Sequence, residues 1–424
     1  MVYCDDTLYA IILSKTLQIE GLVLYSKERK IIEFLEKHVS IILIIVATVL
    51  SAGIRYKGRE FVSGDIDCYL VPWYNTIKAN GGIKALSEQV GDYSIAYQFI
   101  IAILTYIPIK AIYAYKLFSA IFDYFLSVGV GLLICELKHN KFVMKDFAVC
   151  YSALLFLPSI FINSSYWGQC DAIWVSFIVW GLYMFRKGYI TKGFIFWGLS
   201  LSFKLQFVFI FPFIIYLYVS EKRFSAIKFL WLPTVLFIST LPGILMGRDW
   251  LSFIKIYTSQ SSSYEQMTLN APNYWWVQGG YYDFMKKPAI IMTLMLLAAG
   301  LVYIVRYKIN TINNRVFILM ACWSVWTVVN FLPSMHERYF YLLDILMFVL
   351  VFVDFKQYFK FFCFLMIIAV IVYGRYMFNT NFDPYIPSMA FLVMYSYFSY
   401  KVFFECRNCS EIHTNQIEAS PSRT

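Results

Sequence analysis

Two acidic residues close behind the first long apolar segment are the leading candidates for chemistry. Asp65 and Asp67 lie in the stretch Ser63–Tyr74, directly after that segment. A carboxylate near the membrane boundary loses part of its hydration and is costly to keep, which favours a functional role. Such a side chain is suited to act as a general base that takes a proton from a hydroxyl group. The alternative is that either aspartate only caps the short helix expected here.

The residues that follow Asp65 favour a short amphipathic helix. Ile66, Leu70, Trp73 and Ile77 fall on one apolar stripe behind the carboxylate. Such a stripe lies on the surface of a bilayer and leaves the polar face of the helix free. We therefore expect Asp65 to face a cavity from the start of an interfacial helix.

Cationic side chains at two later sites are suited to bind an anionic leaving group. Lys204 interrupts a long apolar stretch, and the turn Pro333–Tyr339 contains His336, Glu337 and Arg338. Arginine supplies fixed positive charge to a phosphate through two parallel hydrogen bonds. In the alternative interpretation, the lysine extends to the membrane interface, and the acidic and basic neighbours of the turn pair on its surface.

Two polar, aromatic turns between apolar segments are candidates for binding a sugar. They span Asn163–Asp171 and Asn270–Trp276. Aromatic rings stack on sugar faces, while Gln, Asn and Asp side chains hydrogen-bond hydroxyl groups. The alternative is a belt of aromatic residues at the membrane interface. The candidate acceptor- or sugar-binding residues are Trp73, Trp167, Gln169, Asp171, Asn273 and Trp275.

The elements that must position these residues are membrane helices. Of the 424 residues, 60% are hydrophobic, 20% aromatic and only 15% charged, whereas soluble domains have about 25% charged residues. Apolar runs long enough to cross a hydrocarbon core of about 30 Å recur from residue 38 to residue 403. Runs of this length exclude barrel strands, so we expect an all-α, polytopic membrane protein.

About twelve crossings are expected, within a range of 10 to 13. We interpret 94–108 as interfacial or re-entrant, because the basic loop Glu136–Lys141 then lies in the cytoplasm. Lys116, Asp123 and Asp344 are charges within the segments, expected to pair helices. The expected segments are 38–56, 111–135, 147–163, 171–185, 193–205, 207–219, 226–246, 288–306, 315–332, 339–353, 358–373 and 385–403.

Three regions follow from this pattern. Residues 1–37 form a cytoplasmic N-terminal segment, 38–403 the membrane domain, and 404–424 a polar cytoplasmic tail expected to be disordered. Segments 193–205 and 207–219 are short and are expected to form a hairpin with Lys204 near its tip. The long outer loops are therefore where function is expected.

Net charge and cysteine content argue against a nucleic-acid-binding protein and against a zinc site. The net charge of +10 comes from basic clusters between apolar segments, which is typical of membrane topology and not of nucleic-acid binding. Cys406 and Cys409 form a single C-x-x-C pair without the further ligands that zinc requires, so we expect reduced thiols and no metal.

Taken together, the motifs resemble a known superfamily. They are SGDIDCYLVPWYNTIKANGG with GDYSIAYQFIIAILTY, then NSSYWGQCDAIW, LSFKLQFVFIFP, NAPNYWW and PSMHERYF. In order and placement they resemble the GT-C superfamily of polyprenyl-phosphate-sugar-dependent glycosyltransferases. The closest group is the bacterial relatives of the mannosyltransferases of glycosylphosphatidylinositol-anchor synthesis. The resemblance covers about residues 38 to 400.

The resemblance implies an inverting, metal-independent glycosyl transfer without a cofactor. Asp65 then acts as the base, with Asp67 as a duplicate carboxylate, and Lys204 and His336 flank the donor phosphate together with Arg338. The expected reaction moves glucose or mannose from undecaprenyl phosphate to an O-antigen or capsular glycan at the outer face of the inner membrane. A flippase and a donor synthase are the expected partner proteins.

Two other functions fit a polytopic chain. A lipid-linked sugar flippase or transporter is expected to carry charges at the bilayer midplane, on broken helices in repeated halves. Here the polar clusters gather at the outer ends of the segments, and the two halves do not match. A non-catalytic assembly protein for polysaccharide synthesis is the other alternative, and it predicts indifference to replacement of Asp65.

Overall fold

The computed structural model describes residues 26–260, 264–378 and 380–418. These residues are about 80% helical, and the two short strands among them, β1 (Thr268–Leu269) and β2 (Met335–His336), pair in parallel. The prediction of an all-α fold is confirmed. In chain order, the helical elements are α2 (Ser26–Gly58), η1 (Ile66–Leu70), α3 (Val71–Ala79), η2 (Gly82–Ser87), α4 (Ile95–Leu104), α5 (Ala111–His139), α6 (Met144–Leu155), α7 (Pro158–Phe161), η3 (Ile162–Trp167), α8 (Asp171–Arg186), α9 (Ile190–Phe203), η4 (Leu205–Phe209), α10 (Phe211–Glu221), η5 (Ala226–Leu230), α11 (Trp231–Leu245), α12 (Ser252–Gln260), α13 (Tyr274–Gln278), α14 (Tyr282–Arg306), α15 (Asn314–Phe331), η6 (Glu337–Phe340), α16 (Tyr341–Val353), α17 (Phe355–Phe378) and α18 (Tyr385–Glu418).

Six helices within the described ranges are long and apolar enough to cross a membrane, or seven if α6 and the α7–η3 segment, bent by 55°, form one span. The chain is therefore a multi-pass membrane protein. Each of the twelve expected segments overlaps a helix, but several of those helices are short. Helix α10, within the expected segment 207–219, has 11 residues and extends for about 16 Å, little more than half of a hydrocarbon core. The six spans are Glu28–Gly58, Ala111–His139, Ala226–Leu245, Tyr282–Arg306, Asn314–Phe331 and Phe355–Phe378.

Two terminal helices extend beyond the predicted apolar segments. Helix α2 begins at Ser26, twelve positions before the predicted start at 38, and polar pairs such as Arg29–Glu33, one turn apart, support that extension. Helix α18 continues to Glu418, so the tail expected to be disordered from residue 404 is helical as far as that residue. The remaining parts of the two terminal predictions, residues 1–25 and 419–424, lie outside the described residues.

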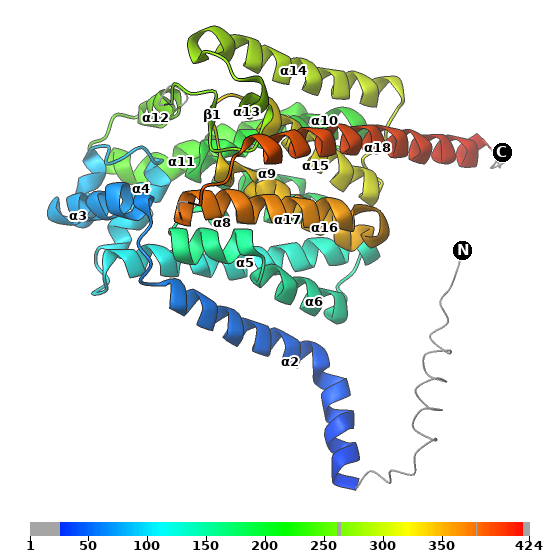
Figure 1. Cartoon of the computed structure of the whole chain (residues 1–424), viewed down its shortest axis with the longest axis horizontal. Helices are drawn as coiled ribbons and strands as arrows, with labels where there is room; N and C mark the ends of the chain where they lie inside the picture. Colours follow the sequence, from blue (N-terminus) through cyan, green and yellow to red (C-terminus); the bar gives the residue numbers. More distant parts are fainter. Residues whose placement is uncertain (1–25, 261–263, 379, 419–424) are drawn as a thin grey trace.

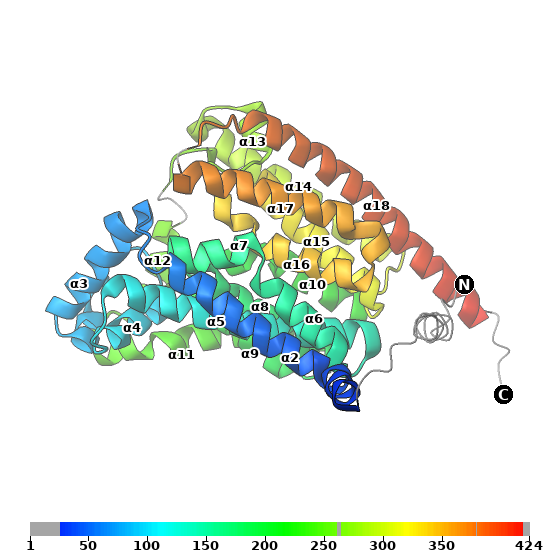
Figure 2. The same cartoon turned by 60° about the horizontal axis from the view of Figure 1, so that its bottom comes forward.

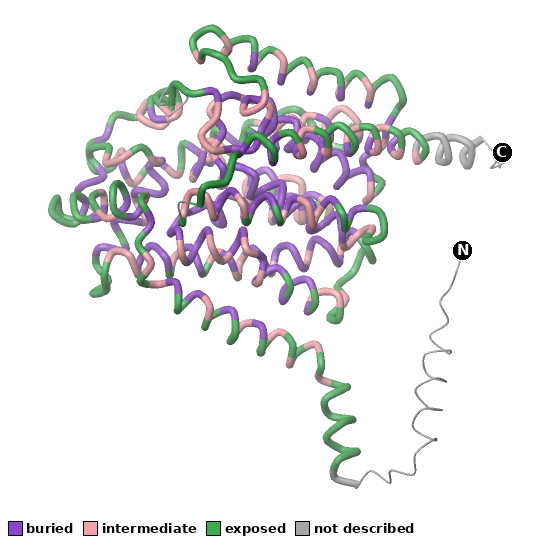
Figure 3. The backbone as a smooth tube through the Cα atoms, viewed as in Figure 1, coloured by how far each residue is buried: buried purple, intermediate pink, exposed green. Residues whose placement is uncertain are grey.

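The core lies between α5, α8, α15 and α16, and the outer helices face away from it. Nearly all of α15 and α16 is buried, and Figure 3 shows this buried centre in purple. Helices α2 and α14 lie at opposite edges of the bundle in Figure 1, and Figure 2 shows α2 across the side that is turned forward. Only 17% and 28% of their apolar windows are buried. Large apolar side chains on an exposed helix face are expected where that helix meets lipid.

Two of the predicted intramembrane charges join α5 to the preceding segment. Asp123 forms an ion pair with Arg55 of α2 at 2.8 Å, and both side chains are buried. Lys116 donates to the carbonyl oxygens of Gly58 and Phe61, at 2.7 and 2.5 Å. The predicted role of Lys116 and Asp123 in pairing helices is confirmed.

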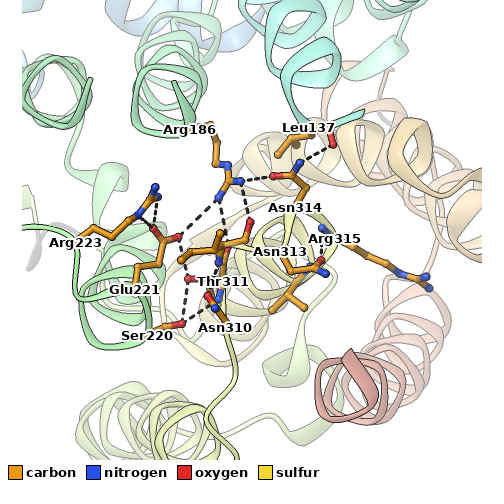
Figure 4. Close-up of polar contacts among 12 residues, drawn as sticks. Leu137, Arg186, Ser220, Glu221, Arg223, Asn310, Thr311, Asn313, Asn314 and Arg315 are labelled. Atoms are coloured by element: carbon orange, nitrogen blue, oxygen red, sulfur yellow. Dashed lines mark hydrogen bonds and ion pairs between the residues drawn. The ribbon is translucent and has the colours of Figure 1, made fainter. Parts of the chain in front are cut away.

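A polar network closes one end of the bundle (Figure 4). The buried carboxylate of Glu221, at the end of α10, lies 3.8 Å from Arg186 Nη1 at the end of α8 and accepts a hydrogen bond from Thr311 at 3.0 Å. Asn314, at the start of α15, accepts from Arg186 and donates to the Leu137 carbonyl of α5. The network therefore fixes the ends of four helices, and α8 reaches it from the opposite end of the bundle.

The apolar stripe behind Asp65 is buried in protein and not on a membrane surface. Ile66, Leu70 and Ile77 are each at most 2% exposed and belong to a second core with residues of α4 and the first part of α5. Trp73 is half-buried at its edge. The expected interfacial placement of this stripe is therefore wrong, because α4 and α5 cover it.

Candidate functional site

Four charged side chains from separate segments meet at the end of the bundle opposite the Glu221 network. Arg338 Nη1 lies 3.3 Å from Asp65 Oδ2, and Arg338 Nε lies 3.7 Å from Asp171 Oδ2. Lys204 Nζ lies 2.5 Å from Asp171 Oδ1. We call Asp65, Asp171, Lys204 and Arg338 the ionic cluster. The structure brings together residues that the sequence singles out from four different places.

Asp65 is held in one orientation by hydrogen-bond donors from distant parts of the chain. Its Oδ2 accepts from Trp167 Nε1 at 2.9 Å, from Gln169 Nε2 and from Arg338, while its Oδ1 accepts from the Tyr376 hydroxyl at 2.6 Å. The side chain is 17% exposed. A carboxylate offers about four lone-pair sites, so this one is almost fully engaged but still accessible.

Capping does not account for Asp65. Its side chain makes no capping hydrogen bond to η1. The neighbouring Ser63 does so instead, because its hydroxyl accepts from the Ile66 amide at 3.3 Å and donates to the Trp167 carbonyl at 2.7 Å. The alternative in which Asp65 is only a helix cap is therefore wrong.

Lys204 lies at a break between two helices and points inward. Helix α9 ends at Phe203, and the extended backbone of Lys204 leads directly into η4. The side chain is 4% exposed and pairs with Asp171, which also accepts hydrogen bonds from Asn163 at 2.9 Å and Trp174 at 3.0 Å. The alternative in which Lys204 extends to the interface is therefore wrong, and its ammonium contributes positive charge to the cluster.

The turn Pro333–Tyr339 is fixed by its pairing with β1. Met335 and His336 align with Thr268 and Leu269, and Ser334 donates a backbone hydrogen bond to the Met267 carbonyl at 3.0 Å. This pairing aims Arg338 into the cluster. Since both acidic and basic members of the turn are buried, the interpretation as a surface pair is wrong.

The other two titratable residues of the turn, Glu337 and His336, have pKa values far from their usual ones. Burial raises the pKa of Glu337 to about 7, and in the described part of the chain neither of its oxygens accepts a hydrogen bond. Burial, with the nearby Arg338 and Lys204, holds the pKa of His336 well below its usual range. His336 is therefore neutral at pH 7, and Lys204 and Arg338 supply the fixed positive charge.

A cavity of about 230 Å³ opens beside the cluster. Lys204, Arg338 and Lys286 line it, together with the carboxylate of Asp92 and aromatic residues that include Tyr339. Asp65 lies just behind this lining, in contact with Arg338. The cavity therefore combines cations, one acid and aromatic rings, which suits a ligand with a phosphate and a hydroxylated ring.

The loop that carries Asp92 and Tyr93 into the cavity is held by a buried arginine. Arg248 donates to the Leu86 and Glu88 carbonyls, and to the side-chain oxygens of Gln89 and Gln98 at 2.8 Å. Gln89 in turn donates to the carbonyl of Tyr93 at 2.8 Å. Burial lowers the pKa of Arg248 to about 10.

This loop is connected to the ionic cluster. The Tyr93 hydroxyl donates to Gln169 Oε1 at 3.0 Å, and Gln169 donates to Asp65. The ring of Tyr93 also lies over the ammonium of Lys204, with 5.7 Å from Nζ to the ring centroid. The position of this loop therefore affects both the Asp65 carboxylate and the Lys204 ammonium.

Several predicted residues are not available to a ligand in the way the sequence suggests. Trp167 and Trp275 are buried, and the rings of Trp167 and Tyr376 stack at 4.5 Å, so neither tryptophan offers an open face to a sugar. Trp275 Nε1 donates to the Phe331 carbonyl, and Asn273 caps α13.

Three further predicted residues also differ from expectation. Trp73 packs against Tyr93 at 5.4 Å and does not line the cavity. Gln169 and Asp171 bind members of the cluster. Asp67 is exposed and makes no hydrogen bond or ion pair through its carboxylate in the ranges described, so the structure does not bring it to the site.

Sequence reasoning missed Asp92, Tyr93, Tyr376 and Arg248. Asp92 and Tyr93 lie within a quoted motif but carry no charge pattern that sets them apart. Tyr376 lies in the apolar helix α17, and one tyrosine among 34 gives no signal.

Comparison with known proteins gives no relative from which a function follows. No protein-family model matches the chain, and no curated protein matches it. Among the residues that the structure describes, no group of three or more His, Cys, Asp and Glu side chains is arranged to hold a metal ion. The functional assignment therefore depends on the geometry of the ionic cluster and its cavity.

Proposed function

We propose that the chain is an inverting glycosyltransferase of the GT-C type. It transfers a hexose, glucose or mannose, from a polyprenyl-phosphate donor to a lipid-linked or cell-surface glycan of O-antigen or capsular type. The observation that carries this proposal is the contact of one accessible carboxylate, Asp65, with a buried cation that lines a cavity at one end of a membrane helix bundle.

Asp65 acts as the general base. Among the described residues, only Tyr376 donates a hydrogen bond to its Oδ1, so a lone pair remains for the acceptor hydroxyl. The carboxylate takes the hydroxyl proton while the acceptor oxygen bonds to the anomeric carbon from the face opposite the phosphate. The bond from that carbon to the phosphate oxygen breaks, and the electron pair leaves with the polyprenyl phosphate. No second acid is needed because this leaving group is an anion.

Lys204 and Arg338 stabilise the leaving phosphate. Both side chains are buried. A charge interaction is stronger in the protein interior than in water. Lys204 is paired with Asp171, and Arg338 is paired with Asp65 and Asp171. A bound phosphate competes for Arg338, which loosens its contact with Asp65 and frees the base. Donor binding and activation of the base are thereby coupled.

The proposal extends to the membrane arrangement. The chain has about twelve crossings in the inner membrane, both termini are cytoplasmic, and the cavity faces outward. Tyr282, Lys286 and Ile290 line the cavity from one face of α14, whose other face is largely exposed. The polyprenyl chain therefore stays in lipid beside α14 while its phosphate enters the cavity. A flippase and a donor synthase supply the donor.

A transfer assay tests the proposal. Membranes that contain the chain, and membranes that lack it, are supplied with a short-chain polyprenyl phosphate carrying radiolabelled glucose or mannose. We expect label in glycan and release of polyprenyl phosphate only where the chain is present. Movement of the labelled donor across sealed vesicles without transfer identifies a flippase instead and contradicts the proposal.

A further inference from the structure

Three polar side chains on outer segments line the cavity beside the cations. Asp92 lies on the loop before α4, Gln260 ends α12, and Tyr264 lies in the segment before β1. None of them belongs to a long membrane helix. Gln260 donates from its amide nitrogen to the Asp92 carbonyl, which joins two of the three segments. We call Asp92, Gln260 and Tyr264 the polar rim.

The rim presents acceptor oxygens that no other side chain among the described residues fills. The Asp92 side chain is exposed to the cavity, and it makes no hydrogen bond to another side chain in the described ranges. The protein around it removes enough water to raise its pKa, although Arg338 and Lys204 offset part of that effect. A carboxylate in such a place gains most from ligand groups that donate hydrogen bonds.

Tyr264 adds an aromatic surface to this rim. Its ring meets the edge of His336, with 4.9 Å between ring centroids, and its backbone carbonyl accepts from the Ser334 hydroxyl at 3.2 Å. Burial, with Asp92 close by, raises the pKa of the Tyr264 hydroxyl, which therefore stays protonated and able to donate. The rim thus offers two side chains with acceptor oxygens, one hydroxyl and one ring.

We infer that the polar rim reads the hydroxyl groups of the transferred sugar, while Lys204 and Arg338 hold its phosphate. The inference rests on the proposed function and names the residues that set its sugar specificity. It assigns to Asp92, Gln260 and Tyr264 the role that the sequence suggests for buried residues such as Trp167 and Asn273. The matching ligand is a pyranose with free neighbouring hydroxyl groups joined to a phosphate.

A division of binding between phosphate and sugar has a measurable signature. A site built to hydrogen-bond a hydroxyl group rejects a ligand that lacks it, because the polar groups of the site are left unpaired. The affinity that the sugar adds to a bare lipid phosphate should therefore depend on the rim. The affinity for the phosphate itself should depend on Lys204 and Arg338.

Binding of two probes to the purified full chain in detergent tests this inference. The probes are a short-chain polyprenyl phosphate and the same phosphate carrying glucose or mannose. We expect the sugar to raise affinity at least tenfold, on the order expected for one or two good hydrogen bonds. In Asp92→Asn and Gln260→Ala that gain falls to about threefold or less, while affinity for the bare phosphate changes less than about twofold. Glu88→Gln, on the same loop outside the cavity, is the matched control and keeps the full gain.

Other outcomes overturn the inference. An unchanged gain in both rim variants, or no gain in the unmodified chain, contradicts it. Retained affinity for the bare phosphate shows that a variant is folded. If one rim variant loses this affinity, the other rim variant provides the test. Failure of the proposed function can be distinguished from failure of this inference. A donor that binds with the expected gain but is never transferred contradicts only the proposed enzymatic activity. A chain that binds neither probe contradicts both.

Discussion

At the scale of single residues, the site depends on groups that hold Asp65 as much as on Asp65 itself. Trp167 and Gln169 direct one oxygen toward Arg338, and Tyr376 fixes the other. A base is effective only when its lone pair meets the proton it removes. The carboxylate without these donors can rotate away from the acceptor.

Tyr376→Phe tests this positioning. The change removes the donor to Oδ1 but keeps the ring that stacks on Trp167. We expect kcat to fall by about 10-fold to 100-fold, since one hydrogen bond to a charged group is worth about 1.5–3 kcal/mol, with donor affinity unchanged. Tyr385→Phe, at an exposed position, is the control. A loss of donor affinity with normal kcat is the contrary result.

The raised pKa of Glu337 predicts how the stability of the folded chain changes with pH. Its pKa is raised to about 7 in the folded chain from 4.5, so between these values the folded state binds more protons than the unfolded state. Stability from this group is therefore fully present below about pH 4.5 and is lost as pH rises toward 7, by roughly 3 kcal/mol. Glu337→Gln removes this loss, and thermal unfolding in detergent should show the variant more stable than the parent at pH 8 and similar at pH 5. Equal stability of the two at pH 8 contradicts the assignment.

At the scale of elements, short breaks between helices create the site. The interruption at Lys204 and the turn Pro333–Tyr339 were predictable, because polar residues there interrupt long apolar runs. Their partners were not predictable from local pattern. Asp65 and Tyr376 are 311 positions apart, and no spacing rule relates them. The burial of the aromatic turns was not predictable either, because a turn that packs against the core has the same residue types as one that faces a ligand.

Arg248→Met tests the side chain that holds the loop between η2 and α4. Within the described ranges, the guanidinium donates to uncharged acceptors on η2, on the loop between η2 and α4, and on α4 itself. We expect faster hydrogen exchange in the peptide that covers 88–93 and a donor affinity about tenfold lower, because Asp92 and Tyr93 lose their fixed positions. Lys255→Met, on the exposed face of α12, should change neither. Unchanged exchange in this peptide contradicts the role assigned to Arg248.

At the scale of the whole molecule, α8 separates two polar ends. Asp171 begins this helix in the ionic cluster, and Arg186 ends it in the Glu221 network. The 16 residues of this helix correspond to about 24 Å, close to the thickness of a hydrocarbon core. A membrane helix bundle was predictable from composition, whereas the short buried helices within it reflect tertiary packing that hydropathy does not report.

Chemical labelling tests which end faces outward. Single cysteines at Glu88 and Lys187, in a cysteine-free background, are exposed to a membrane-impermeant maleimide in intact cells. We expect labelling at position 88 and none at 187 until the membrane is opened, because both positions are exposed but lie at opposite ends of the bundle. The reverse pattern contradicts an outward-facing cavity.

The most direct test of the central claim compares Asp65→Asn with Asp67→Asn in the radiolabelled transfer assay. The two aspartates are close in sequence and have the same chemistry, but of the two only Asp65 belongs to the ionic cluster. We predict that Asp65→Asn lowers the transfer rate by about 10²-fold to 10⁴-fold while donor still binds, and that Asp67→Asn stays within about threefold of the parent. Equal rates for the two variants, or a larger loss from Asp67→Asn, contradict the account.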